Sequence, residues 1–250
     1  GASLVSLFQV YRHLSMTTQS YNLIFLASCE EEVSGKNGIE SVLPQLPPIA
    51  LGVVGEPTEM QPAIAEKGLM VLDVTARGKS GHAARNEGEN AIYKLLPDIE
   101  WFRTYQFPKE SPILGPVKMS VTQINAGTQH NVIPDLCSIV VDIRSNECYS
   151  NEELFAEICQ HIQSEAKARS FRLNSSSIPS DHPFVKRAIE LGKVPFGSPT
   201  LSDQALMPFP SVKMVPGKSS RSHTADEYIL VSEIEEAIST YVQILDGLKI

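Results

Sequence analysis

Two short runs of consecutive apolar residues constrain the fold of this chain more than any other feature. They cover residues 23–27 and 49–54. Short, uninterrupted apolar runs are typical of strands in a sheet that is covered on both faces. An apolar stripe at helical spacing over residues 4–14 precedes the first run. Helices packed on such strands predict an α/β layer.

The middle of the chain has a different pattern. Its elements follow the order β-α-β-β-α-β, which is the ferredoxin-like pattern. We therefore expect an α+β domain of residues 67–177, inserted into an α/β domain formed by residues 1–66 and 178–250. The expected elements are strands at 69–76, 117–124, 136–143 and 168–173, a helix at 89–102 that Pro97 should kink, and a helix from the capping box Ser150–Glu153 to 166.

The flanking segments predict further helices and a strand. A short helix is expected at 38–43 and another after Pro183. A strand at 212–215 should precede a final helix that begins at a capping box of Ser232 and Glu235.

Composition excludes several classes of protein. The 250 residues carry 21 basic and 29 acidic side chains, a net charge of −8 that disfavours nucleic-acid binding. No apolar stretch reaches the length of a bilayer span, so no membrane partner is expected. The four cysteines form no CxxC pair. This favours reduced thiols in a cytoplasmic protein.

Glutamates follow both apolar runs. Glu30, Glu31 and Glu32 come after the first run, and Glu56 comes after the second. In open α/β sheets, the carboxyl ends of strands form the edge where ligands bind. Because adjacent carboxylates repel one another unless a cation neutralises them, this pattern indicates a metal. Taken singly, a run of acids is usually a solvated surface, and an acid between Gly and Pro is usually a turn.

Two loops contribute histidines. His223 lies in a loop of small residues before the final helix, where a lone histidine is usually solvated, but with glutamates nearby it completes a zinc-compatible set. His82 lies in the glycine-rich turn 78–84. That turn resembles part of a phosphate loop, but Asp73 stands where the motif requires glycine, so nucleotide binding is excluded.

Together, six segments resemble the acetylornithine deacetylase and succinyl-diaminopimelate desuccinylase family of di-zinc amidohydrolases. They span residues 29–228. The resemblance implies an aminopeptidase-like α/β zinc domain interrupted by a ferredoxin-like dimerisation domain, and hence a homodimer. In chain order the segments are CEEEVSGKNG, VVGEPT, GKSGHAA, NAGTQHNVIP with DIRS, LSDQAL, and SRSHTADEY.

The resemblance also implies a role for each matching residue. Two zinc ions, which cobalt could replace, are expected per active site. The implied roles are general base for Glu31, zinc ligands for Glu32, Glu56 and His223, oxyanion stabilisation from the partner subunit for His82, and substrate binding for Asn131 and Arg144. The family usually has an Asp-Glu-Glu run, and here Glu30 replaces the aspartate.

The expected substrate is an N-acyl amino acid, most closely N-acetyl- or N-succinylornithine, with release of ornithine in arginine biosynthesis. A succinyl-diaminopimelate desuccinylase and a dipeptidase are alternatives that use the same site. The resemblance further implies a zinc-binding histidine and a bridging aspartate before the first helix. We therefore expect a polypeptide that begins at Gly1 to be N-terminally truncated and to bind zinc poorly. An inactive dimerising module is the alternative from a different class.

Overall fold

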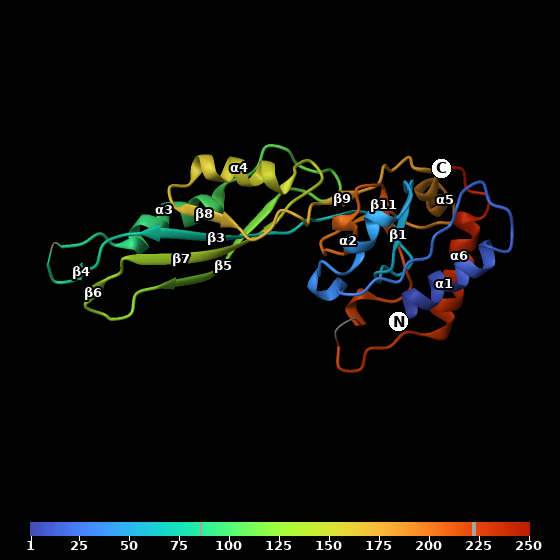
Figure 1. Cartoon of the computed structure of the whole chain (residues 1–250), viewed down its shortest axis with the longest axis horizontal. Coiled ribbons are helices and arrows are strands. Elements are labelled where there is room, and N and C mark those ends of the chain that lie inside the picture. Colours follow the sequence, from blue (N-terminus) through green and yellow to red (C-terminus); the bar gives the residue numbers. More distant parts are fainter. Residues whose placement is uncertain (86, 222–223) are drawn as a thin grey trace. The chain divides into compact units, whose positions relative to one another are not determined.

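The computed structural model describes residues 1–85, 87–221 and 224–250 (Figure 1). The chain divides into two compact units. The first contains residues 1–66 and 176–250, and the second contains residues 67–175. None of the helices among the described residues combines the length and the apolar character that crossing a membrane requires.

A mixed sheet forms the centre of the first unit. Its order is β1-β11-β2-β10, with β9 pairing with β2. β1 and β11 run parallel, and Val54 lies opposite Lys213. The segments that leave these two strands therefore start from the same edge of the sheet. The strands are β1 (Gly52–Val54), β2 (Ala63–Glu66), β9 (Ser176–Ser177), β10 (Phe196–Ser198) and β11 (Ser211–Lys213).

The helices of this unit bury an apolar core. α1 (Ala2–Leu14) packs against α6 (Val231–Leu245), and α5 (Pro183–Glu190) also contacts α6. Leu14, Phe184, Tyr241 and Ile244 are almost fully buried in the core. The helices expected at 4–14 and after Pro183 are confirmed. The short α2 (Ile39–Val42) also matches its expectation.

Two expectations for the first unit are wrong. Residues 23–27 form no strand, because they have no ladder partner among the described residues; instead, the ring of Phe25 packs on Phe8 and Tyr11. The final helix is not capped by Ser232 and Glu235. The Glu233 carboxylate accepts the backbone N–H of Leu230 at 2.9 Å and so caps the helix two residues earlier than expected.

The second unit has the ferredoxin-like fold. Its sheet has the order β5-β7-β3-β8, and every neighbouring pair is antiparallel. The helices α3 and α4 follow β3 and β7 in the chain, which confirms the predicted β-α-β-β-α-β pattern. The elements are β3 (Met70–Arg77), α3 (Ala91–Thr104), β5 (Lys118–Ala126), β7 (Leu136–Arg144), α4 (Asn151–His161) and β8 (Glu165–Ala168).

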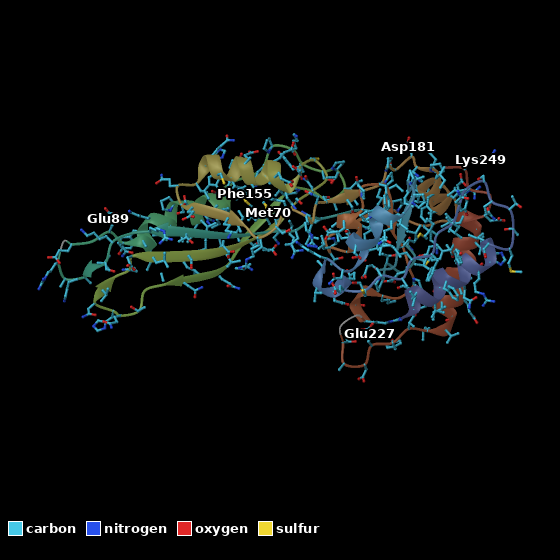
Figure 2. All side chains as sticks on the ribbon, in the orientation of Figure 1. Met70, Glu89, Phe155, Asp181, Glu227 and Lys249 are labelled. Carbon is cyan, nitrogen blue, oxygen red and sulfur yellow. The ribbon has the colours of Figure 1, made fainter. Side chains whose placement is uncertain are left out.

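One face of this sheet is buried. Alternate residues of β3 and β7 point into the core, as a period of two requires. Met70 lies in this core and Phe155 of α4 packs against it (Figure 2). The capping box of Ser150 and Glu153 is present at the start of α4. The helix ends at His161 rather than 166, and β8 lies earlier than the expected strand at 168–173.

Candidate active site

The loop of residues 28–38 carries the three consecutive glutamates. It contains the 3-10 helix η1 (Glu31–Val33), flanked by Glu30 and Ser34 in the left-handed region at φ 60° and 46°. The Glu30 carboxylate accepts two hydrogen bonds of 3.1 Å, one from the backbone N–H and one from the side-chain amide of Asn37. Glu30 therefore closes the loop.

Two glycines make this loop possible. A Cβ atom on Gly35 would lie 2.1 Å from Oε2 of Glu30, and one on Gly38 would lie 2.3 Å from the carbonyl oxygen of Cys29. Both approaches are much closer than van der Waals contact allows. The shape of the loop therefore requires glycine at both of these positions in CEEEVSGKNG.

The start of the loop is held by a second carboxylate. Ser28 donates from Oγ to Oδ2 of Asp203 at 3.0 Å. Asp203 is the first residue of the 3-10 helix η3 (Asp203–Leu206), whose N-cap is Ser202. Asp203 lies in the matching segment LSDQAL, but no role for it was predicted from the sequence.

Glu56 lies in the segment that follows β1. Two residues later, Thr58 is buried and hydrogen-bonded to Val215, with its N–H donating to the Val215 carbonyl at 3.2 Å and its Oγ1 accepting the Val215 N–H at 3.1 Å. Glu59 likewise donates its N–H to the carbonyl of Gly217 at 2.9 Å. The segment after β1 is therefore tied to the segment after β11, which leads toward His223.

The carboxylates of this unit act on one another. Burial, and then the charges of Glu56, Asp203 and Glu32, raise the pKa of Glu31 to about 7. Burial also raises the pKa of Glu56, against the lowering effect of Lys213 and with Glu32 contributing. The pKa of Asp203 is raised as well, mainly by burial. These groups therefore share one electrostatic environment near the edge where β1 and β11 end.

The donor chemistry of this edge fits a divalent cation. Carboxylate oxygens from Glu32 and Glu56 and an imidazole nitrogen are the ligand types that zinc takes in catalytic sites. The mutual repulsion of the carboxylates is also what a cation would relieve. Within the described residues, no three His, Cys, Asp or Glu side chains form a metal-binding group. The predicted ligand His223 lies outside those residues.

His82 belongs to the second unit. It is the last residue of β4 (Gly81–His82), which pairs with β6 (Val132–Ile133), and its side chain is exposed. Nδ1 of His82 accepts the backbone N–H of Ala84 at 3.1 Å. In the neutral ring, this contact assigns the proton to Nε2. Nε2–H is then a hydrogen-bond donor.

The two predicted substrate-binding residues also lie in the second unit. The carbonyl of Asn131 accepts the N–H of Ala83 at 3.0 Å, so Asn131 adjoins the β4–β6 pair that carries His82. Arg144 ends β7, and its Nε and Nη2 donate to the carboxylate of Asp142 at 2.8 and 3.0 Å. A bidentate contact with another carboxylate would therefore have to use the Nη1 side of Arg144.

Comparisons with known proteins agree with this architecture. Residues 64–170 match the family model described as the peptidase dimerisation domain, M20_dimer. A succinyl-diaminopimelate desuccinylase of Cereibacter sphaeroides is 30% identical over 77% of this chain and 57% of its own length. An acetylornithine deacetylase of Proteus mirabilis is 26% identical over 94% of this chain and 66% of its own length. The chain thus spans less than two thirds of either relative.

Solved structures share the fold. The aminopeptidase PepT of Bacillus cereus matches with a TM-score of 0.78 at 18% identity, over 98% of this chain and 69% of its own. The YXEP protein of Bacillus subtilis, described as a dinuclear metal-binding peptidase of the M20 family, matches with a TM-score of 0.60 at 17% identity, over 87% of this chain and 62% of its own. The matching dimerisation domain, the relatives and the shared fold agree with the resemblance seen in the sequence, and the chain is similar over most of its length to M20 peptidases and amidohydrolases, which are hydrolytic enzymes.

Proposed function

We propose that the protein is a zinc-dependent amidohydrolase that cleaves the amide bond of an N-acyl amino acid. The observation that carries this proposal is the shared electrostatic environment of Glu31, Glu32 and Glu56 near the edge where β1 and β11 end. N-acetyl- or N-succinylornithine is the proposed substrate, with release of ornithine. The similarity to an acetylornithine deacetylase supports this choice.

Succinyl-diaminopimelate is the second candidate substrate. It is favoured by one observation, namely that the relative with 30% identity is a desuccinylase of this compound, whereas the deacetylase is 26% identical. Both substrate classes carry an amide and a free carboxylate. Arg144 of the second unit suits a carboxylate, which it can contact with two parallel hydrogen bonds.

In the proposed mechanism, Glu32 and His223 would hold one zinc ion and Glu56 would hold the other. Zinc held by these residues would supply Lewis-acid activation of the amide carbonyl and of the attacking water. Glu31 takes the proton from the attacking water and delivers it to the leaving amine, as a general base that later acts as an acid. His82 donates from Nε2 to the developing oxyanion, a contact whose loss typically costs about 3–4 kcal/mol.

The second unit would form the homodimer through β5. This strand lies at the end of its sheet, and an uncovered edge strand is a ready partner for another chain. Ile124 of β5 lies opposite Ile139 on the helix-covered face, yet 57% of it is exposed. Tyr93 and Leu96 of α3, which packs over β5, are also exposed. The match to a dimerisation domain supports a second copy as the occupant.

Replacing Glu31 by Gln in the full-length, zinc-loaded protein tests the proposed reaction. We expect kcat for acetylornithine, succinylornithine or succinyl-diaminopimelate to fall about 10²- to 10⁴-fold, since the proton acceptor is lost. Glu235→Gln, at an exposed position of α6, is the matched control and should retain activity. Full activity in Glu31→Gln with the fold intact would reject the proposal and favour the dimerising module.

The ratio of kcat/KM values of the wild-type protein for these three compounds identifies the substrate. A preference for an ornithine derivative supports the deacylase, and a preference for succinyl-diaminopimelate supports the desuccinylase. Hydrolysis of dipeptides alone would support the peptidase alternative.

A further inference from the structure

A buried ion pair lies in the sheet of the first unit, and neither of its side chains has a role in the proposed mechanism, although the charge of Lys213 lowers the pKa of Glu56. Lys213 ends β11 and Glu66 ends β2, and their side chains are 3% and 0% exposed. Nζ of Lys213 lies 3.3 Å from Oε2 of Glu66. Burying two charges costs free energy that their attraction only partly returns. A fully buried ion pair is therefore weak evidence that the fold is stabilised by it. Its role is better inferred from the residues that it contacts.

The pair holds the segment of residues 200–203 at two points. Nζ of Lys213 donates to Oγ1 of Thr200 at 3.1 Å. Ser202 donates twice to Glu66, from its backbone N–H to Oε1 at 3.1 Å and from Oγ to Oε2 at 2.8 Å. All four residues lie in the first unit, and Ser202 is 4% exposed.

Ser202 transmits this anchoring to the catalytic loop. Its Oγ also accepts the N–H of Gln204, so it caps η3 and fixes the direction in which Asp203 leaves the segment. Asp203 accepts the hydroxyl of Ser28, at the start of the loop that carries Glu31. The chain of contacts therefore runs from the buried pair to Ser202, and then through Asp203 to residues 28–38.

We propose that Glu66 and Ser202 are positioning residues that hold Asp203 against Ser28 and thereby fix the loop of the catalytic base. The role of Glu31 as the base rests on the proposed function, whereas the fixing of the loop by Ser202 and Asp203 does not. At its far end, the same loop is closed by Glu30 and Asn37. The Ser28–Asp203 contact is thus the second anchor of the loop.

Hydrogen exchange tests the positioning without reference to activity. We expect Ser202→Ala to speed amide exchange in residues 28–38 about tenfold or more, the change that loss of a hydrogen bond to a charged group can produce. Ser28→Ala should do the same, and the double variant should exchange no faster than the faster single variant. Ser202→Thr, which keeps the hydroxyl, should restore the wild-type rate.

The controls separate positioning from general loosening of the fold. Ser15→Ala removes an exposed hydroxyl that donates to Arg12 at the end of α1, and it should leave residues 28–38 unchanged. Exchange in α4 of the second unit is the internal reference. Unchanged exchange of residues 28–38 in Ser202→Ala, or independent and multiplicative effects of the two serine substitutions, would overturn the proposal.

Kinetics then connect the loop to the proposed function. In the full-length protein with zinc, Ser202→Ala should lower kcat about tenfold or more with KM nearly unchanged, because a displaced base slows chemistry rather than substrate binding. If the wild-type protein hydrolyses none of the three compounds but the exchange pattern holds, the proposed function fails and the positioning inference stands. If exchange responds while kcat does not, the loop is fixed by Ser202 but does not carry the base, and the catalytic part of the inference is wrong.

Discussion

At the scale of residues, Glu30, Glu31 and Glu32 are chemically identical neighbours with different surroundings. Glu30 is bound by two donors of Asn37. Glu31 is half-buried, and its burial, followed by the charges of neighbouring carboxylates, raises its pKa. The sequence predicted that acids gather at a sheet edge, because a run of three glutamates is visible in it, but the strand expected to precede that run is absent from the described residues 23–27. It could not predict which glutamate closes the loop, since that depends on backbone angles at Glu30 and Ser34.

The sequence also could not predict the contacts of Asp203 or of the buried pair Lys213 and Glu66. The segment LSDQAL was visible, but the partners Ser28 and Glu66 lie more than 130 residues away in the chain. Nothing in the spacing of these residues indicates that they meet. Long-range polar contacts of this kind require the folded sheet.

Gly38→Ala tests whether the loop is as tightly closed as the structure indicates. A Cβ atom at this position would meet the backbone carbonyl of Cys29, which cannot move aside as a flexible side chain can. We expect a loss of about 1–3 kcal/mol in the free energy of unfolding, the usual range for overpacking. Urea denaturation measures it. Lys36→Ala, which shortens an exposed side chain in the same loop, should change stability by less than about 0.5 kcal/mol.

At the scale of elements, periodicity predicted the helices well and their ends poorly. α1, α3 and α4 lie where apolar spacing indicated, and Pro97 lies inside α3 without ending it. The run 23–27 was mistaken for a strand, because a continuous apolar run shows that a segment is buried but does not supply a ladder partner. Phe25 is held through its ring instead.

The N-terminus of α5 has a pH-sensitive cap. Nδ1 of His182 accepts the N–H of Phe184 at 3.2 Å, which requires a neutral ring. Burial lowers the pKa of His182, against the raising effect of neighbouring Asp181, which Figure 2 labels. Because the folded pKa lies below the unfolded value, the unfolded state binds the proton first. This contribution to stability is complete above the unfolded pKa of about 6.5 and is lost as the pH falls through that value toward the folded pKa.

His182→Asn isolates this contribution, because asparagine also caps helices but does not titrate between pH 5 and 7. We expect the wild-type protein to lose up to about 1 kcal/mol more stability than the variant between pH 7 and pH 5.5. Urea midpoints at the two pH values measure the difference, and other titrating groups cancel between the proteins. An equal loss in both proteins would exclude His182 as the source.

At the scale of the whole molecule, the alternation of patterns along the chain predicted an inserted domain. The strand order of the second unit agrees with the ferredoxin-like expectation, because each strand and helix of that pattern has its own periodic signal. The strands of the first unit were harder to predict. β2, β9 and β10 have only two to four residues, too few for a period to be recognised.

In the proposed dimer, the second unit takes part in catalysis, because His82 of one protomer would act on the substrate bound by its partner. Ile124→Lys places a charge at an exposed position of β5. In the proposed dimer this lysine would be buried without a partner. We expect the full-length variant to be monomeric by light scattering and to lose about 10²-fold or more in kcat, the range for loss of one oxyanion donor. Val194→Lys, at an exposed apolar position in the first unit, should stay dimeric and active. If the variant remains dimeric, the interface does not include β5. A monomer with full activity would instead show that His82 acts within its own chain or not at all.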